Sequence, residues 1–230
     1  MRSLRRYIET ISPNYSFGNF HVALSQVLDQ FARGRYPLLI IQAPPQHGKS
    51  EMFSRLLPGY LFALHQGIDI IAVSYGDELA RKNAVAARRY IEFEQYAALF
   101  PDVMINNDKS KKVNKQTEFE TNSGSYRATG IGGSITGHGG SFILIDDPIK
   151  NQEQADSAAY RQKVWEFFTS TILTRFRPMV THKGKIITGG IGLTLTRWHE
   201  DDLAGRLIDL AKLDPNFTQP VVFNFPAIKE

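Results

Sequence analysis

The apolar residues of this chain follow two patterns that alternate along its length. Continuous apolar runs of strand length, typical of strands buried on both faces, occur at 37–43, 69–75, 141–147, within 185–196 and at 220–225. Between these runs, apolar positions recur at helical spacing over 20–33, 50–65, 77–100, 154–176 and 200–212. Two short segments on either side of Asn122 to Gly124 predict a hairpin. This alternation predicts an α/β fold with a mostly parallel central sheet and helices on both faces.

Length and composition indicate one soluble domain. The chain has 230 residues, 42% of them hydrophobic and 22% charged, as in ordinary globular proteins, and we expect 1–230 to form a single domain. It contains no cysteine, which excludes disulfides and cysteine-ligated zinc. No apolar run approaches the roughly 20 residues that cross a bilayer, so we expect no membrane partner. Lys and Arg exceed Asp and Glu by 27 to 23, a bias compatible with a polyanionic partner.

The segment APPQHGKSE, Ala43 to Glu51, lies between a predicted strand and a predicted helix. A phosphate-binding loop needs backbone N–H groups curled around the phosphates, a lysine for the terminal phosphates and a hydroxyl for magnesium. Lys49 and Ser50 fit these roles, although the common pattern has glycine where this chain has Ala43. The alternative is a helix cap at Ser50. The strand–loop–helix context favours the phosphate-binding loop.

The segment FILIDDP, Phe142 to Pro148, ends an apolar strand in two adjacent carboxylates. Asp146 is predicted to hold magnesium, directly or through water, and Asp147 to orient or deprotonate the water that attacks the γ-phosphate. The alternative is a polar strand end that turns at Pro148. The phosphate-binding loop upstream favours the catalytic interpretation, because the two features act together.

A third segment, GLTLTRWHEDDLAGRL at 192–207, is by composition only a strand followed by a capped helix with early acidic residues. Its acidic residues are adjacent and would point in different directions on a helix, which disfavours a metal cluster. However, APPQHGKSE, ITGHGGSFILIDDPIKNQEQADS and LTRWHEDDLAGRL occur in the order and approximate spacing of one known family. Over most of residues 20–227 the chain resembles the ATPase domain of the large terminase subunit of tailed bacteriophages.

The resemblance implies an ASCE-type P-loop NTPase that couples ATP hydrolysis to translocation of double-stranded DNA into a procapsid. It implies a Walker B strand that ends at Asp146, with Asp147 in the position of the catalytic acid, and a coupling motif at Thr194 and Thr196. Magnesium, held by Ser50 and Asp146, is the implied cofactor. The residues expected to contact ATP in the Walker A loop are Pro45, Gln46, His47, Gly48, Lys49, Ser50 and Glu51.

The resemblance also implies partners and a location. We expect a ring-forming homo-oligomer on a portal, a small terminase subunit and double-stranded DNA as partners, in the host cell cytoplasm. The family has a C-terminal nuclease domain of RNase H-like fold, and this chain ends at FPAIKE directly after the last predicted strand. We therefore expect no nuclease activity from it. Residues 1–36 are expected to form lead-in helices.

Two positions depart from the family pattern, because relatives usually have arginine where this chain has Gln46 and His138. Arginine is the usual residue that stabilises charge in phosphoryl transfer. The substitutes that the sequence offers are Arg127, Arg175 and Arg177. The alternative for each of them is an arginine exposed to solvent at the surface, where most arginines lie.

Two further sets of candidates rest on weaker signals. The resemblance directs attention to the segment before the first strand for the adenine, where the candidates are Phe20, His21 and Gln26. Each of these also fits a helix start or a core position. The basic loop 109–115 and the pairs Arg81-Lys82 and Arg88-Arg89 are candidates for the DNA backbone, although most charge runs are solvated faces.

Two other functions remain open from the sequence. One is a different P-loop ATPase such as a helicase core, which would need a second recombinase-like domain or strand-separating motifs. The other is a DNA-binding and docking module with a degenerate, inactive nucleotide site, an alternative motivated by Ala43, Gln46 and His138.

Overall fold

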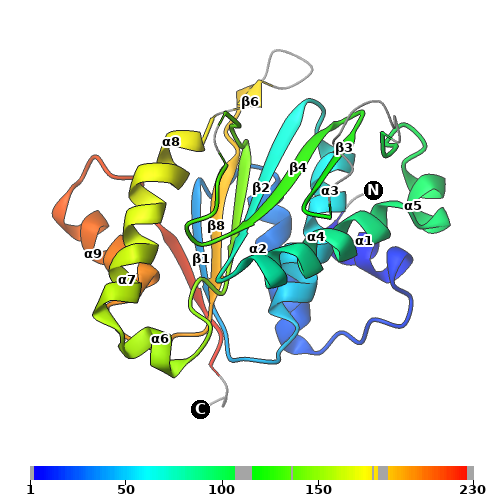
Figure 1. The fold of residues 1–230 in the computed structure, drawn as a ribbon. Helices are drawn as coiled ribbons and strands as arrows, with labels where there is room; N and C mark the ends of the chain where they lie inside the picture. Colours follow the sequence, from blue (N-terminus) through cyan, green and yellow to red (C-terminus); the bar gives the residue numbers. More distant parts are fainter. Residues whose placement is uncertain (1–2, 107–115, 136, 178, 181–185, 227–230) are drawn as a thin grey trace.

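A seven-stranded sheet runs through the middle of the molecule (Figure 1). The structure, a computed structural model, describes residues 3–106, 116–135, 137–177, 179–180 and 186–226. The strands lie in the order β3-β4-β2-β5-β8-β1-β9, and all neighbours are parallel except β3 and β4. Their bounds are β1 Leu38–Gln42, β2 Ile68–Ser74, β3 Glu118–Thr121, β4 Gly124–Gly130, β5 Phe142–Asp146, β8 Gly190–Leu195 and β9 Val221–Asn224. The predicted mostly parallel sheet and the β3–β4 hairpin are confirmed.

The continuous apolar runs form the inner strands of this sheet. Every residue of β5 and β8 is buried, as expected for strands covered on both faces, whereas β9 at the sheet edge is only half-buried at alternate positions. The strand pair predicted within 185–196 is formed differently. Its first strand, β7 (Ile186–Ile187), pairs with β6 (Met179–Val180) in a separate two-stranded sheet, and only β8 joins the main sheet.

Helices cover both faces of the sheet. One face carries α1 Leu4–Ile11, α2 Asn19–Ala32, the π-helix η1 Glu51–Leu56, α3 Leu57–Leu64, α4 Asp77–Ile91 and α5 Glu94–Leu99. The other carries α6 Gln152–Asp156, α7 Ala158–Glu166, the π-helix η2 Phe167–Ile172, α8 Leu173–Arg175 and α9 Leu203–Leu213. Each face of the sheet has its own hydrophobic core, and successive side chains of β5 point to opposite faces. Leu144 packs in the core under the first set of helices, whereas Ile143 and Ile145 pack in the core under the second set.

Three predicted helices have different boundaries in the structure, each for a local reason. The helix predicted over 77–100 is two helices, because Phe93 is extended and begins α5. The helix predicted over 154–176 starts earlier and is interrupted at Ser157, whose hydroxyl accepts from the Tyr160 N–H and caps α7. The helix predicted from 200 begins at Leu203, because Asp202 caps it by accepting from the Gly205 N–H at 2.9 Å.

The described part of the chain has no helix with the length and apolar character needed to span a bilayer.

The packing of α1 on α3 gives a first testable prediction. A Cβ at Gly59 would overlap the hydroxyl of Tyr7, and that hydroxyl is buried without a hydrogen-bond partner. We expect Gly59→Ala to lower the free energy of unfolding by about 2 kcal/mol, as overpacking does, although alanine favours helix more than glycine. Tyr7→Phe should be close to neutral alone and should remove most of the Gly59→Ala penalty. Chemical denaturation of the two single variants and the double variant measures this, and an equal penalty in both backgrounds would contradict it.

Candidate nucleotide site

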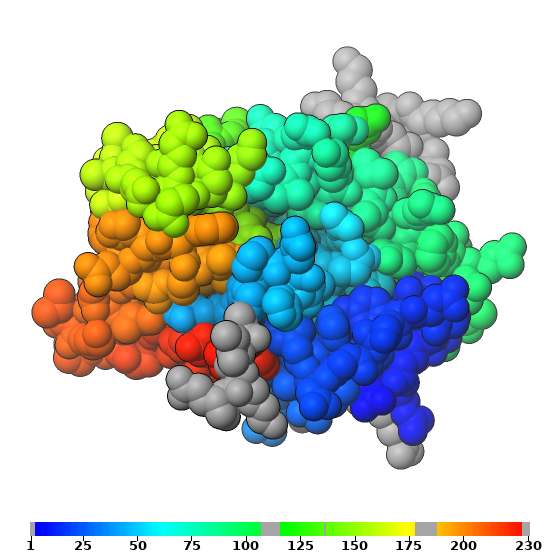
Figure 2. Space-filling view, turned by 90° about the horizontal axis from the view of Figure 1, so that it is seen from below, coloured from blue at the N-terminus to red at the C-terminus, as the bar shows by residue number. Residues whose placement is uncertain are grey.

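The loop after β1 curls tightly at the edge of the sheet where the parallel strands end. Gln46 and Gly48 both have left-handed backbone conformations, with φ of 62° and 74°. A Cβ at Gly48 would come within 3.1 Å of the His21 ring, so the glycine also permits close packing. Pro45, Gln46 and His47 are exposed at the tip. Figure 2 looks onto this edge, where the light-blue region of the loop lies near the centre of the face.

Lys49 is buried at the base of this loop and connects it to two other strands. Its side chain is 5% exposed, and its Nζ lies 2.9 Å from Oδ2 of Asp147, which follows β5. The same ammonium donates to Oγ1 of Thr196, just beyond β8, at 3.0 Å. Lys49 therefore bridges the ends of β1, β8 and β5, and its charge is compensated within the chain.

Asp146 is 1% exposed and is surrounded by hydrogen-bond donors. Its Oδ1 accepts from the hydroxyls of Ser50 at 3.1 Å and Thr194 at 2.8 Å, and its Oδ2 accepts from Ser54 at 2.7 Å. Asn83 Nδ2 lies at 3.5 Å from the same Oδ2. These bonds fix the carboxylate beside the Ser50 hydroxyl.

Oxygen ligands of this kind suit Mg²⁺, which is usually held by one or two carboxylates together with substrate phosphates. The described residues contain no group of three or more His, Cys, Asp or Glu side chains that could hold a metal. Ser50 and Asp146, whose side chains are hydrogen-bonded to each other, are residues that could hold such an ion together with phosphates.

Asp147 sits in a constrained position between Lys49 and the end of β8. Its backbone is left-handed, with φ of 44°, and its N–H donates to the carbonyl of Thr194 at 2.8 Å. Its Oδ1 accepts from the N–H of Thr196 at 2.9 Å. Burial and the neighbouring Asp146 carboxylate raise the pKa of Asp147, and Lys49 opposes that rise. A carboxylate placed in this way is chemically able to take a proton from water once Lys49 is engaged elsewhere.

The segment that contains this site matches a known family. Residues 40–178, more than half of the chain, match the family model described as "Terminase large subunit, T4likevirus-type, N-terminal". The chain belongs to the family of large terminase subunits. A comparison with curated protein sequences gave no match.

Solved terminase structures share the fold. The large terminase of bacteriophage HK97 is 15% identical, with a TM-score of 0.56, over 100% of this chain and 45% of that one. A mutant ATPase domain of the Thermus phage P74-26 large terminase is 13% identical, with a TM-score of 0.55, over 85% of this chain and 70% of that one. The large terminase of a thermophilic bacteriophage, in complex with ATP-gamma-S, is 10% identical, with a TM-score of 0.50, over 88% of this chain and 43% of that one.

These similarities and the family match confirm the predicted P-loop NTPase fold. In this chain β8 lies between β1, which leads into the loop that contains Lys49, and β5, which ends in Asp146. The chain spans less than half the length of the HK97 terminase and of the terminase in complex with ATP-gamma-S.

In this terminase chain, the Glu51 side chain is hydrogen-bonded to residues of η1 and α4. Its carboxylate accepts from Arg55 at 2.7 Å and from the hydroxyl of Tyr90 at 2.5 Å, and Arg55 in turn donates to Asn83 at 2.9 Å. This network joins η1 to α4 and continues to Asp146 through Asn83. Glu51, which is a predicted ATP contact, thus has a hydrogen-bond partner on α4. Ser54 and Asn83, which the sequence analysis did not identify, also lie at the predicted site.

Two of the three adenine candidates lie at the loop. The ring of Phe20 is 6.0 Å from that of His47. Burial lowers the pKa of His21, whose ring also hydrogen-bonds the backbone of His47 and accepts from the Gly18 N–H at 3.1 Å. His21 therefore lies between the start of α2 and the loop, and its contact with adenine stays a prediction. Gln26 is exposed and lines a separate cavity with Ser3, Arg5, Ser25, Asp29 and Gln30.

The three arginine candidates do not lie at the site of their own chain. Arg127, within β4, is ion-paired with Glu118 at 3.2 Å and is 20% exposed. Arg175 and Arg177 are bonded through their backbones to Gly140, just before β5. Gly140 precedes β5 and Asp146 ends it, so six extended residues at about 3.3 Å each place the backbones of these two arginines roughly 20 Å from that of Asp146, near the opposite ends of the parallel strands.

The basic pairs proposed for DNA are engaged within the chain. Lys82 pairs with Glu78 at 2.7 Å and Arg88 with Glu92 at 2.8 Å. Arg81 donates to Gln116 at 3.0 Å, and Arg89 lies over the ring of Phe93. The basic loop 109–115 lies outside the described residues.

Proposed function

We propose that this chain binds ATP with Mg²⁺ and hydrolyses it, as the motor of a viral machine that moves double-stranded DNA into a procapsid. The observation that supports this most directly is the ion pair of Lys49 with Asp147 beside the Ser50–Asp146 hydrogen bond. A phosphate-loop lysine, a magnesium hydroxyl and two carboxylates are brought within one hydrogen-bond network, as phosphoryl transfer to water requires.

In this mechanism, backbone N–H groups of the loop and the start of η1 bind the phosphates. Lys49 moves from Asp147 to the terminal phosphates, because the phosphate charge exceeds that of one carboxylate. Asp147 is then free to accept the proton of the attacking water, while Thr196 N–H continues to orient it. Mg²⁺, held by Ser50 and Asp146, would neutralise phosphate charge. Thr194 and Thr196 sense the exchange, since one contacts Asp146 and the other contacts Lys49.

The proposed partners follow from the family. Double-stranded DNA, a ring of identical subunits on a portal and a small terminase subunit are those of a packaging motor, acting in the host cell cytoplasm. The alternative of a docking module with an inactive nucleotide site makes the opposite prediction about hydrolysis, and the same experiments therefore decide between the two.

The two carboxylates should give different defects. Asp147→Asn should leave nucleotide affinity largely intact and lower hydrolysis by about a hundredfold or more, because it removes the proton acceptor. Asp146→Asn should mainly weaken magnesium-dependent nucleotide binding. Titration calorimetry with and without Mg²⁺, together with phosphate release, measures both. The reverse pattern would mean that the two roles are exchanged.

Lys49→Ala is the control for this pair of variants and should abolish turnover. Lys49 is buried and compensates Asp147, so we expect this variant also to lose some thermal stability, and its folding needs to be checked by circular dichroism. Turnover equal to that of the unchanged chain would remove the phosphate-loop assignment and favour the docking module.

The position of the arginines predicts catalysis between subunits. A guanidinium supplied by a neighbour contributes about a thousandfold or more in related systems, so specific activity should rise with protein concentration. Arg175→Ala or Arg177→Ala should be inactive alone and should regain activity when mixed with Lys49→Ala, because a mixed interface has one intact site. Arg127→Ala is the expected neutral variant, since Arg127 is already paired with Glu118. Activity independent of concentration, without rescue in any mixture, would rule this out.

A further inference from the structure

The loop between β8 and α9, residues 197–202, begins at the candidate nucleotide site. Thr196, directly before it, contacts both Lys49 and Asp147. The loop is held together internally, because Asp201 N–H donates to Nδ1 of His199 at 2.9 Å and Arg197 is ion-paired with Asp202 at 2.8 Å. A shift of Thr196 would therefore move the loop as one piece.

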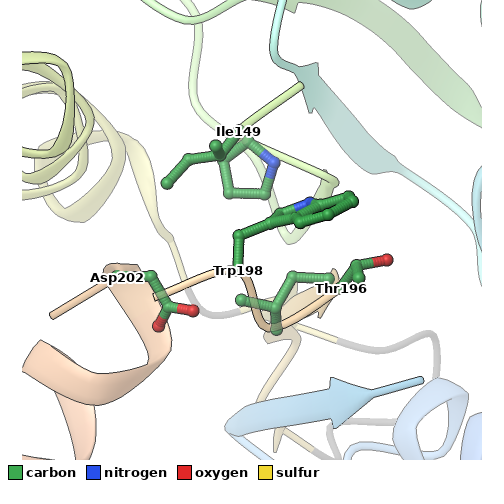
Figure 3. Close-up of a pocket in the computed structure, with 6 residues that line it drawn as sticks. Ile149, Thr196, Trp198 and Asp202 are labelled. Carbon is green, nitrogen blue, oxygen red and sulfur yellow. The ribbon is translucent and has the colours of Figure 1, made fainter. Parts of the chain in front are cut away.

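Trp198 packs this loop against the chain that follows Asp147. Its indole lines a shallow pocket with Pro148, Ile149, Leu195, Thr196 and Asp202 (Figure 3). In Figure 3 the ring lies between Ile149 on one side and Thr196 on the other. The end of β5 and the end of β8 thus contact each other through an aromatic side chain as well as through the Asp147–Thr196 hydrogen bond.

At its other end the loop is attached to two helices through Asp201. Arg206 of α9 donates to both Asp201 oxygens, at 2.7 and 2.9 Å, and Arg161 of α7 donates to Oδ2 at 3.0 Å. Arg161 also donates to the Ala155 carbonyl at 2.5 Å, and Arg206 to Gln162 at 2.8 Å. We call Asp201, Arg161 and Arg206 the Asp201 clamp.

Helix α7 has a second attachment to the same edge of the sheet. The hydroxyl of Tyr160, adjacent to Arg161, lies 3.3 Å from the carbonyl of Tyr75 after β2 and 3.5 Å from that of Pro148 after β5. The first turns of α7 are therefore in contact with segments that follow β2, β5 and β8.

We propose, on the basis of the proposed function, that Arg161 and Arg206 are positioning residues that act through Asp201 to hold Thr196 and Asp147 for catalysis. The same contacts transmit the exchange of Lys49 between Asp147 and phosphate to helix α7. The coupling motif that the family resemblance implies lies at the strand end, and the clamp extends it to two helices on one face of the sheet.

The form of the clamp suits positioning better than stability. An isolated exposed ion pair contributes little to folding, and the Asp201 side chain is 43% exposed. A bidentate guanidinium–carboxylate pair nevertheless fixes direction as well as distance. Arg206 and Arg161 hold the pKa of Asp201 well below its usual range, so the clamp stays charged at neutral pH.

The two tryptophans of the chain report on the two ends of this path. Trp198 lies beside Thr196, and Trp165 of α7 lies under the guanidinium of Arg206, 5.9 Å from its ring centre. Trp165→Phe and Trp198→Phe each leave one reporter. Fluorescence of both single-tryptophan chains is measured as Mg²⁺ and ATPγS are added, and calorimetry measures nucleotide binding independently.

We expect both reporters to respond in chains with an intact clamp. When Arg161→Ala or Asp201→Asn is added, the Trp198 response should remain and the Trp165 response should be lost, with kcat about tenfold lower and KM unchanged. Arg161→Lys should retain part of the Trp165 response and part of the lost kcat. The matched control is Asp209→Asn, which removes the exposed Lys212–Asp209 ion pair of α9, with a distance of 2.8 Å. This variant should change neither the Trp165 response nor kcat.

Each outcome has one meaning. If calorimetry detects no nucleotide binding to the unchanged chain, the proposed function itself fails. If nucleotide binds and Trp198 responds, but Trp165 is silent or responds equally after Asp201→Asn, the clamp proposal alone is overturned. A loss of folding in Arg161→Ala would show in its melting curve, and Arg161→Lys and Arg206→Lys then decide the question.

Discussion

The ion pair between Lys49 and Asp147 is the interaction on which the geometry of the site depends. Because β8 lies between β1 and β5, the lysine reaches across the end of β8 to the carboxylate, and it contacts Thr196 on the way. Backbone hydrogen bonds join the same three strand ends, from Ala43 to Leu195 at 3.1 Å and from Asp147 to Thr194 at 2.8 Å. A displacement of any one of these ends therefore changes the surroundings of the others.

The charges in this region are incompletely balanced, which suits the proposed chemistry. Lys49 compensates Asp147, but among the described residues no cationic side chain is paired with Asp146. Among the described residues, neutral donors surround that buried carboxylate, namely three hydroxyls and the more distant amide of Asn83. A buried charge without a counter-ion is unfavourable. A divalent cation that arrives with a nucleotide would supply the missing positive charge. The phosphates would at the same time compete with Asp147 for Lys49, so that binding of substrate would release the carboxylate that catalysis needs.

The sequence predicted the elements of the site whose signals are local. The strand–loop–helix around Lys49 and the apolar strand that ends in Asp146 and Asp147 are each contained in fewer than ten residues, and their strand and helix contexts are confirmed. Ser54 and Asn83 were missed because their role depends on how η1 and α4 pack against β5, and a serine or asparagine in a helix carries no sign of that partner. The breaks at Phe93 and Ser157 were missed for a similar reason, since local caps prevailed over the longer periodicity. The adenine contact of His21 stays a prediction, and its contacts with Gly18 and with the loop depend on how α2 packs beside the loop, which the sequence does not indicate.

The most direct test of this mechanism is a crystal structure of the chain with Mg²⁺ and ATPγS. We expect that Lys49 Nζ leaves Asp147 for the terminal phosphates, that Ser50 and Asp146 lie at the metal, and that Asp147 keeps its hydrogen bond from Thr196. A nucleotide bound elsewhere, or one bound at the loop while Lys49 remains paired with Asp147, would contradict it.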